Sequence, residues 1–152
     1  MRVALDTNIL AYVSGLIRSS ADPAKVEQAR DMIDRLIAEH ELIVPTQVLG
    51  ELFNAMTKGG LDRSEAREIV DLADKRYIIA VGTQDCFRHA LDLAVDHKMQ
   101  FWDSLILCTA AAGDCTVLLS EDMQDGFTTR GVTIANPFLP RLQPVLARLV
   151  GD

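Results

Sequence analysis

Four carboxylates stand at positions where an α/β fold brings separate chain segments to one edge of its sheet: Asp6, Glu51, Asp103 and Asp122. Two like charges 4 Å apart repel by roughly 4 kcal/mol at an effective dielectric near 20, so clustered carboxylates are either partly protonated or assembled around a cation. Hard divalent ions prefer oxygen ligands, and Mg²⁺ usually keeps several waters and meets phosphate groups. The residue types therefore predict a divalent-metal site suited to phosphodiester chemistry.

The elements that must position these acids can be read from the apolar pattern. Apolar runs predict strands over residues 3–5, 42–44, 77–81, 116–119 and 132–135, and helical spacing predicts helices over 23–39, 47–58, 62–74, 83–98, 103–112 and 144–150. Asp22 is the predicted cap of the first of these helices. Strands that are apolar throughout are typical of a mainly parallel sheet covered on both faces. We predict an α/β fold, a three-layer α/β/α sandwich, in a single domain of residues 1–152.

Topology predicts that three of the acids meet. Ligands of open parallel sheets bind beyond the carboxyl ends of the strands. Asp6 and Asp122 each follow a predicted strand, and Asp103 opens a helix that runs back to the start of the next strand. All three therefore belong to the same edge of the sheet.

Glu51 is placed by helical geometry instead. It lies about one turn into its predicted helix, just outside the apolar stripe and beside Val48 and Ala55. This border position suits a side chain that reaches into a cleft between helix and sheet. Taken alone, however, such a glutamate is more often solvent-facing.

The other acids also have structural interpretations. Asp6 could cap a following helix, and Asp122 and Asp125 stand in a segment that ends in an ordinary Asp-Gly turn signal. Asp103 could cap its own helix, although that helix is apolar nearly all round and so belongs near the core. The set of acids indicates function more strongly than any member does.

Charge and composition restrict the partners. The net charge of -7 is the wrong sign for holding nucleic acid by bulk electrostatics, so any such contact is local or metal-mediated, and a basic protein partner is plausible. The apolar N-terminal stretch is interrupted by Asp6, Asn8 and Arg18 before a signal peptide or membrane span could form. We therefore expect a cytoplasmic protein that does not enter a membrane.

Several other kinds of site lack their residues. The three cysteines form no C-x-x-C pair and are interpreted as small buried apolar residues, and the three histidines are isolated from them and from one another. No glycine-rich phosphate loop and no G-x-S-x-G turn is present. Nucleotide-triphosphate and serine-hydrolase chemistry therefore have no support.

Four segments together resemble the PIN domain, and more narrowly the VapC-type toxins of prokaryotic toxin-antitoxin pairs. They are Leu5-Asp6-Thr7-Asn8-Ile9-Leu10, Pro45 to Glu51, Trp102-Asp103-Ser104-Leu105-Ile106 and Leu118 to Gly126. Each segment is short, but the four keep their order and spacing over essentially the whole chain.

The resemblance implies Mg²⁺- or Mn²⁺-dependent endoribonuclease activity on RNA, a homodimer, and inhibition by a small cognate antitoxin protein. At the matching positions, the metal-binding acids would be Asp6, Glu51, Asp103 and Asp122, with Thr7, Asn8 and Ser120 as polar supports. Asp125 matches a less regular position. One or two cations would lower the pKa of a bound water that attacks the phosphorus, so no side-chain nucleophile is needed.

Three other functions stay open. A phosphotransferase of the haloacid dehalogenase type would use Asp6 as nucleophile, but it usually has a second aspartate where Asn8 stands. A binding module could use the same fold without catalysis, and a housekeeping RNA-processing nuclease could use the same site. Lys58, Arg130 and Arg18 are candidates for contacting an RNA backbone, and their spacing does not separate them from ordinary surface cations.

Overall fold

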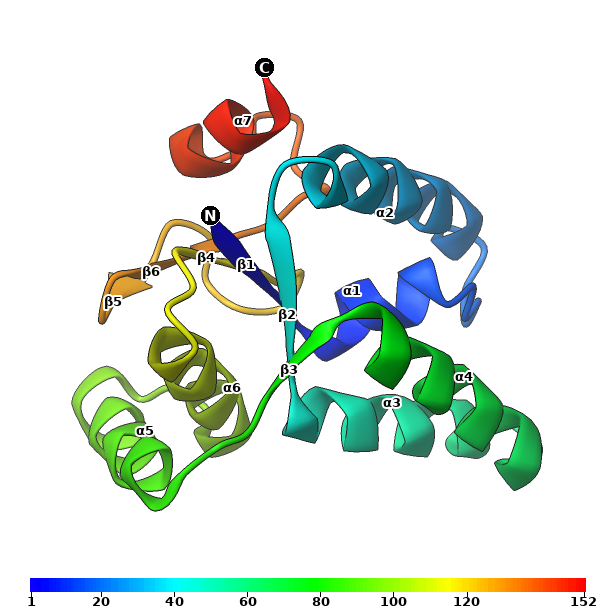
Figure 1. Ribbon diagram of the computed structural model, residues 1–152, viewed down its shortest axis with the longest axis horizontal. Helices are drawn as coiled ribbons and strands as arrows, with labels where there is room; N and C mark the ends of the chain where they lie inside the picture. The colour runs from blue at the N-terminus through cyan, green and yellow to red at the C-terminus, as the bar shows by residue number, and fades with distance from the viewer.

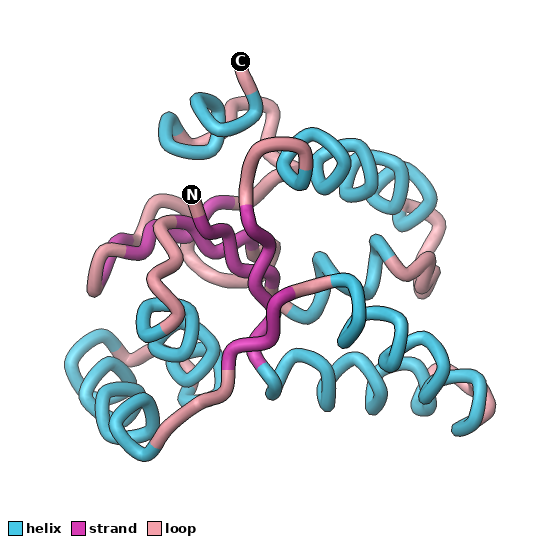
Figure 2. The backbone as a smooth tube through the Cα atoms, viewed as in Figure 1, coloured by secondary structure: helices cyan, strands magenta, loops and turns pink.

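A six-stranded sheet runs through the centre of the protein, as the computed structural model of residues 1–152 shows (Figures 1 and 2). Its strands are β1 (Arg2–Leu5), β2 (Glu41–Pro45), β3 (Ile78–Ala80), β4 (Val117–Leu119), β5 (Thr128–Thr129) and β6 (Val132–Ala135). The helices are α1 (Thr7–Val13), α2 (Asp22–Ile37), α3 (Thr46–Lys58), α4 (Arg63–Arg76), α5 (Gln84–His97), α6 (Phe101–Ala112) and α7 (Pro144–Val150).

The strand order determines which residues share an edge. The order is β3-β2-β1-β4-β6-β5, and every pairing is parallel except that of β5 with β6. Leu5 pairs with Leu119, and the backbone N–H of Asp6 donates to the Leu119 carbonyl at 3.0 Å. The segments that follow β1 and β4 therefore begin side by side at the carboxyl edge of the sheet.

Helices cover both faces of this sheet. Figure 1 shows α5 and α6 on one side and α1, α2 and α7 on the other, with α3 and α4 packed together beyond the end of β2. One core of 35 buried residues draws on the strands and on the helices of both faces. Val3, Ala4 and Leu5 are all 0% exposed, which explains why β1 is apolar at every position after Arg2. The predicted three-layer α/β fold is confirmed.

Two predicted helix starts are wrong. Asp22 is not the cap of α2: the cap is Ala21, and the Asp22 carboxylate instead accepts the backbone N–H groups of Arg18 and Ser19 at 2.6 and 2.9 Å. Asp103 does not open α6, because that helix starts two residues earlier and is capped by Gln100. Helix α1 is the helix that Asp6 was expected to be able to cap, although its extent was not predicted, and β5 was not predicted.

The cysteines are buried and free, as predicted. Burial raises the pKa of Cys108 to about 11 and that of Cys115 to about 12, so both thiols are protonated at neutral pH. None of the helices combines the length and the apolar character needed to cross a bilayer.

Candidate active site

Asp6 lies at the centre of the acidic site, at the junction of β1 and α1. It caps α1, with Oδ1 accepting the Thr7 N–H at 2.7 Å, and its Oδ2 accepts the Ser120 hydroxyl at 2.7 Å. The residue is only 6% exposed. Burial raises its pKa to about 6, and the charges of Asp103 and Glu51 add to the rise, while the two hydrogen bonds oppose it.

Glu51 reaches this site from α3. Its Oε2 accepts the Thr7 hydroxyl at 2.5 Å, and its Oε1 accepts the Gln47 amide at 2.7 Å. The same amide donates to the Trp102 carbonyl at 3.3 Å, which ties α3 to the start of α6. Gln47 Oε1 is buried without any hydrogen-bond donor in the protein. Glu51 therefore faces the cleft, as its position on the helix predicted, and Gln47 orients it.

Asp103 lies in the first turn of α6. Its backbone N–H donates to the Gln100 side chain at 3.1 Å, so Gln100 is the cap and the Asp103 carboxylate makes no hydrogen bond. Partial burial raises the pKa of Asp103, and the charges of Glu51 and Asp122 raise it further. The capping interpretation of Asp103 is thereby excluded, and its carboxylate is available to another group.

Asp122 is the most exposed of the four acids, in the loop after β4. Its Oδ2 accepts the Asn8 amide, and Asn8 Oδ1 accepts the Arg18 guanidinium at 3.1 Å. Thr7 and Asn8, adjacent in the chain, thus orient two acids that come from different elements. Asp125 is not part of this set, because its carboxylate accepts the Asn136 N–H at 2.8 Å and the Gln143 amide, near β6 and α7.

One residue that anchors this loop was not anticipated. Glu121, between two predicted site residues, accepts the Tyr12 hydroxyl at 2.8 Å and forms an ion pair with Lys25 of α2. The Lys25 ammonium also lies 5.6 Å from the centre of the Tyr12 ring. We call these three residues the Glu121 anchor. The only signal for it in the sequence is the position of a glutamate directly before Asp122.

The four acids lie within electrostatic range of one another, because Asp103 and Glu51 raise the pKa of Asp6 while Glu51 and Asp122 raise that of Asp103. They do not converge on one point, and no group of three acidic, histidine or cysteine side chains is arranged to hold a metal ion. Hydrogen bonds keep three of the four carboxylates in their present orientations. The all-oxygen donor set is of the kind that a hard divalent cation binds together with waters.

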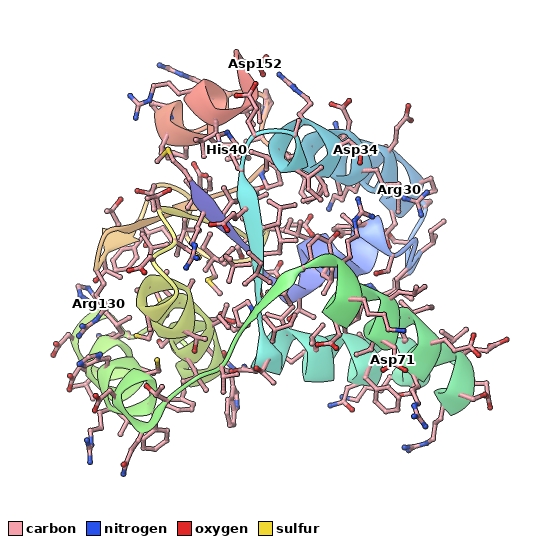
Figure 3. All side chains as sticks on the ribbon, in the orientation of Figure 1. Arg30, Asp34, His40, Asp71, Arg130 and Asp152 are labelled. Atoms are coloured by element: carbon pink, nitrogen blue, oxygen red, sulfur yellow. The ribbon has the colours of Figure 1, made fainter.

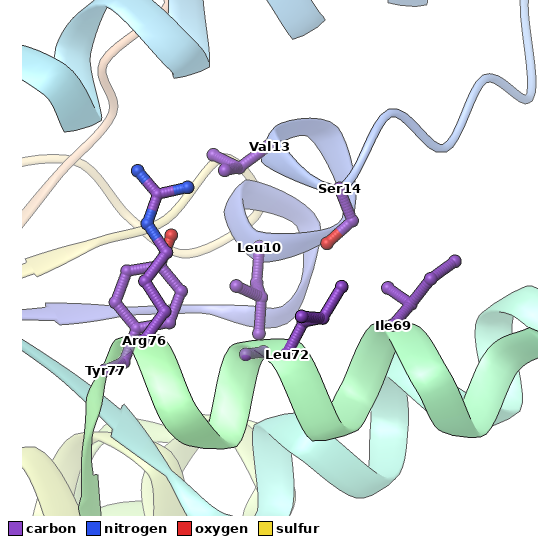
Figure 4. Close-up of a pocket in the computed structure, with 8 residues that line it drawn as sticks. Leu10, Val13, Ser14, Ile69, Leu72, Arg76 and Tyr77 are labelled. Atoms are coloured by element: carbon purple, nitrogen blue, oxygen red, sulfur yellow. The ribbon is translucent and has the colours of Figure 1, made fainter.

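A separate apolar hollow lies between α1 and α4 (Figure 4). It has a volume of about 200 Å³, and Leu10, Val13, Ile69 and Leu72 line most of it. At one end the Tyr77 hydroxyl is buried without a hydrogen-bond partner. None of the four acids lines this hollow.

Fold and site together define an α/β protein with an oxygen-rich acidic site at the carboxyl edge of a parallel sheet. The sequence model of the PIN domain matches residues 3–125, and the chain therefore belongs to the PIN domain family. A search of curated protein sequences returns no match.

Solved structures with the same fold include three associated with toxins. VapBC2 from Rickettsia felis, bound to a DNA fragment from its promoter, has a TM-score of 0.67 over 90% of this chain and 98% of its own, at 18% identity. A toxin-antitoxin complex from Klebsiella pneumoniae gives 0.65 with the same coverage and identity. VapC20 of Mycobacterium tuberculosis, a toxin that cleaves the sarcin-ricin loop, gives 0.61 at 18% identity over 79% of this chain and 89% of its own. At this identity the likeness establishes the fold.

Proposed function

We propose that this protein is a divalent-metal-dependent endoribonuclease and the toxin of a type II toxin-antitoxin pair. The observation that carries the proposal is that Asp6, Glu51 and Asp103, from three separate elements, lie within electrostatic range of one another, and that Asp122 lies within range of Asp103. Membership of the PIN family and the likeness to VapC structures support it. We further propose that residues 1–152 act as one domain, in the cytoplasm, as a homodimer.

In this proposal the four acids hold Mg²⁺ or Mn²⁺, which when bound lowers the pKa of a coordinated water and offsets the charge of the phosphate. The chain's own contribution is to orient the ligands. Ser120 holds Asp6, Thr7 holds Glu51 and Asn8 holds Asp122, each through a side-chain hydrogen bond. None of these bonds pairs a hydroxyl or thiol with a histidine, so nothing at the site resembles an activated side-chain nucleophile.

The test is cleavage of a structured RNA by the purified protein in Mg²⁺ or Mn²⁺, with a chelator as blank. Asp103→Asn should lower the cleavage rate by about 100-fold or more, since loss of even an outer-shell partner of a metal site costs 10- to 100-fold. Asp125→Asn is the matched control and should retain most of the activity, because Asp125 contacts other elements. Equal cleavage by wild type and Asp103→Asn would show a contaminating nuclease and remove the support for the proposal.

The proposed partner is a small antitoxin, because two of the similar structures are toxin-antitoxin complexes. The net charge of -7 suits a basic partner. The hollow of Figure 4, whose lining residue Leu72 is 66% exposed, offers a place for an apolar side chain of that partner. In the same cleavage assay, the product of a small reading frame next to this gene should inhibit the wild type. The absence of such a frame would favour a housekeeping RNA-processing nuclease.

One observation favours a second candidate, a binding module without catalysis. Three of the carboxylates are engaged in side-chain hydrogen bonds, and no three acidic side chains form a group that could hold a metal ion. A protein that binds RNA but cleaves none in either metal would establish this alternative.

A further inference from the structure

A cleft next to the acidic site combines two cations with one of its acids. It has a volume of about 520 Å³ and lies between α3 and the turn after α1. Its lining residues are Arg18, Glu51, Asn54, Ala55, Lys58 and Gly59. Because Glu51 belongs to both, the cleft and the acidic site are continuous.

Neither cation in this cleft forms an ion pair. Arg18 and Lys58 are both exposed, and none of the six ion pairs in the structure includes either of them. Arg18 donates one hydrogen bond, to Asn8 Oδ1 at 3.1 Å, and its guanidinium lies 6.0 Å from the centre of the Tyr12 ring. A guanidinium has five N–H donors, so most of those of Arg18 are free to bind a ligand.

The chemistry of this lining is that of an anion site. A guanidinium binds phosphate oxygens through two parallel hydrogen bonds, an ammonium binds them as a point charge, and an amide such as that of Asn54 adds a neutral donor. In a protein of net charge -7, two unpaired cations beside one cleft are a local exception to the repulsion that the whole molecule exerts on nucleic acid.

We propose that the cleft binds a backbone phosphate of single-stranded RNA adjacent to the phosphate that reaches the four acids. The inference rests on the proposed function for the identity of the substrate. Its geometry is independent of that function: Arg18 contacts Asn8, which holds Asp122, while Glu51 forms the opposite wall. A strand crossing the acidic site therefore passes Arg18 and Lys58 next.

The structure also separates the three cations that were equivalent in the sequence. Arg130 lies in the turn between β5 and β6, near α5 and away from α3 (Figure 3). It does not line the cleft. Arg130 is therefore excluded from this phosphate site.

The test is the affinity of the full-length protein for a fluorescently labelled single-stranded RNA oligonucleotide, measured by anisotropy in EDTA over a range of salt concentrations. The double variant Arg18→Ala/Lys58→Ala should raise Kd about tenfold, since hydrogen bonds to charged groups are stronger than hydrogen bonds between neutral groups. The slope of log Kd against log salt should fall by about 0.7 for each lost phosphate contact. Lys58→Arg should retain the affinity, because it keeps the charge.

Lys75→Ala and Arg141→Ala are matched controls, because both residues are exposed, lie outside the cleft and take part in no ion pair. They should leave Kd and its salt slope unchanged, and thermal melts should show that all variants are folded. Three results would each overturn the proposal. The first is an equal loss of RNA affinity in the control and cleft variants, and the second is no RNA binding by the wild type. The third is displacement of the RNA by a polyglutamate peptide at equal charge concentration.

The two proposals fail separately. Loss of RNA affinity in the cleft variants of a protein that never cleaves RNA would support the phosphate site and refute the nuclease. The opposite result is metal-dependent cleavage that Asp103→Asn abolishes, with the same KM for RNA in the wild type and in the cleft double variant. It would support the nuclease and refute the phosphate site.

Discussion

Asp6 has two roles that oppose each other energetically. As the cap of α1 and the acceptor of the Ser120 hydroxyl it stabilises the local structure. As a carboxylate that is 6% exposed and close to two other acids, it is costly to ionise. The raised pKa of Asp6 means that burial and the neighbouring charges disfavour its ionised form more than the two hydrogen bonds favour it.

The first prediction concerns the pH dependence of the metal-free protein. The pKa of Asp6 is raised from its ordinary value of 3.8 to about 6, so the folded state binds a proton more tightly than the unfolded chain. Ionised Asp6 then costs on the order of 3 kcal/mol above pH 6, and this cost is relieved as the pH falls from 6 to 3.8. In EDTA, Asp6→Asn should therefore melt higher than wild type at pH 7.5, and the difference should shrink by pH 4.5.

Asp96→Asn is the control, because Asp96 is exposed on α5 and makes no hydrogen bond or ion pair. Its melting temperature should follow that of the wild type at every pH. A lower melting temperature for Asp6→Asn at pH 7.5 would mean that the cap dominates and that the acids repel one another little.

The sequence was informative about Asp6, Asp103 and Asp122 because each follows a strand or lies in a first helical turn, where topology determines its position. Glu51 lies in the second turn of α3, and helical periodicity predicted its orientation instead. The sequence was not informative about Gln47 and Glu121. Their roles depend on distant partners, Trp102 and Lys25, that only the folded chain brings close. Capping was misjudged at Asp22, because a cap requires backbone geometry outside the helix and Asp22 lies inside α2. The start of α6 was placed two residues late, at Asp103.

Among the elements, α1 matters most to the site and was the hardest to foresee. It has seven residues, too few for a clear helical pattern, and it begins within the polar Asp6-Thr7-Asn8 segment. Its first turn supplies the hydrogen bonds that orient Glu51 and Asp122. The longer helices α2 to α5 were recognised because each carries a sustained apolar stripe, and α6 because it is apolar nearly all round.

Helix α5 carries a feature that the buried core does not explain. Phe87, Leu91 and Val95 follow one another at intervals of four residues and are 48%, 45% and 78% exposed. Residues at this spacing lie on one face of a helix. An apolar stripe open to solvent suits contact with a second copy of the chain, which is the proposed homodimer.

The second prediction follows from this stripe. Val95→Glu should shift the protein from dimer to monomer in light scattering, because it buries a charge in the contact. Leu72→Glu, which places the same charge on α4, should leave the mass unchanged. A wild type that is monomeric at high micromolar concentration would count against the dimer, and a dimer in both variants would place the contact elsewhere.

At the scale of the whole molecule, the acidic site lowers the stability of the metal-free fold. Asp6, Glu51 and Asp103 repel one another in the folded state, while in the unfolded chain they are far apart. A divalent ion that binds only the folded state adds RT ln(1 + [L]/Kd) to the free energy of unfolding, about 2.7 kcal/mol at a hundredfold excess over Kd.

The third prediction is a rise in melting temperature when millimolar Mn²⁺ or Mg²⁺ is added. The expected shift is about 2–4 °C for each kcal/mol of binding energy, and it should be much smaller in Asp103→Asn. Scanning calorimetry measures it without any RNA. An unchanged melting temperature in both metals would show that the acids do not gather around a cation.

The Glu121 anchor has a consequence for how the loop that carries Asp122 is held. Lys25 belongs to α2, whereas Glu121 directly precedes Asp122 in the loop after β4. The ion pair therefore tethers this loop to a helix that supplies none of the four acids. The most exposed of the four acids is thus restrained from outside the acidic site, through a helix whose Ile33 and Leu36 are 0% exposed.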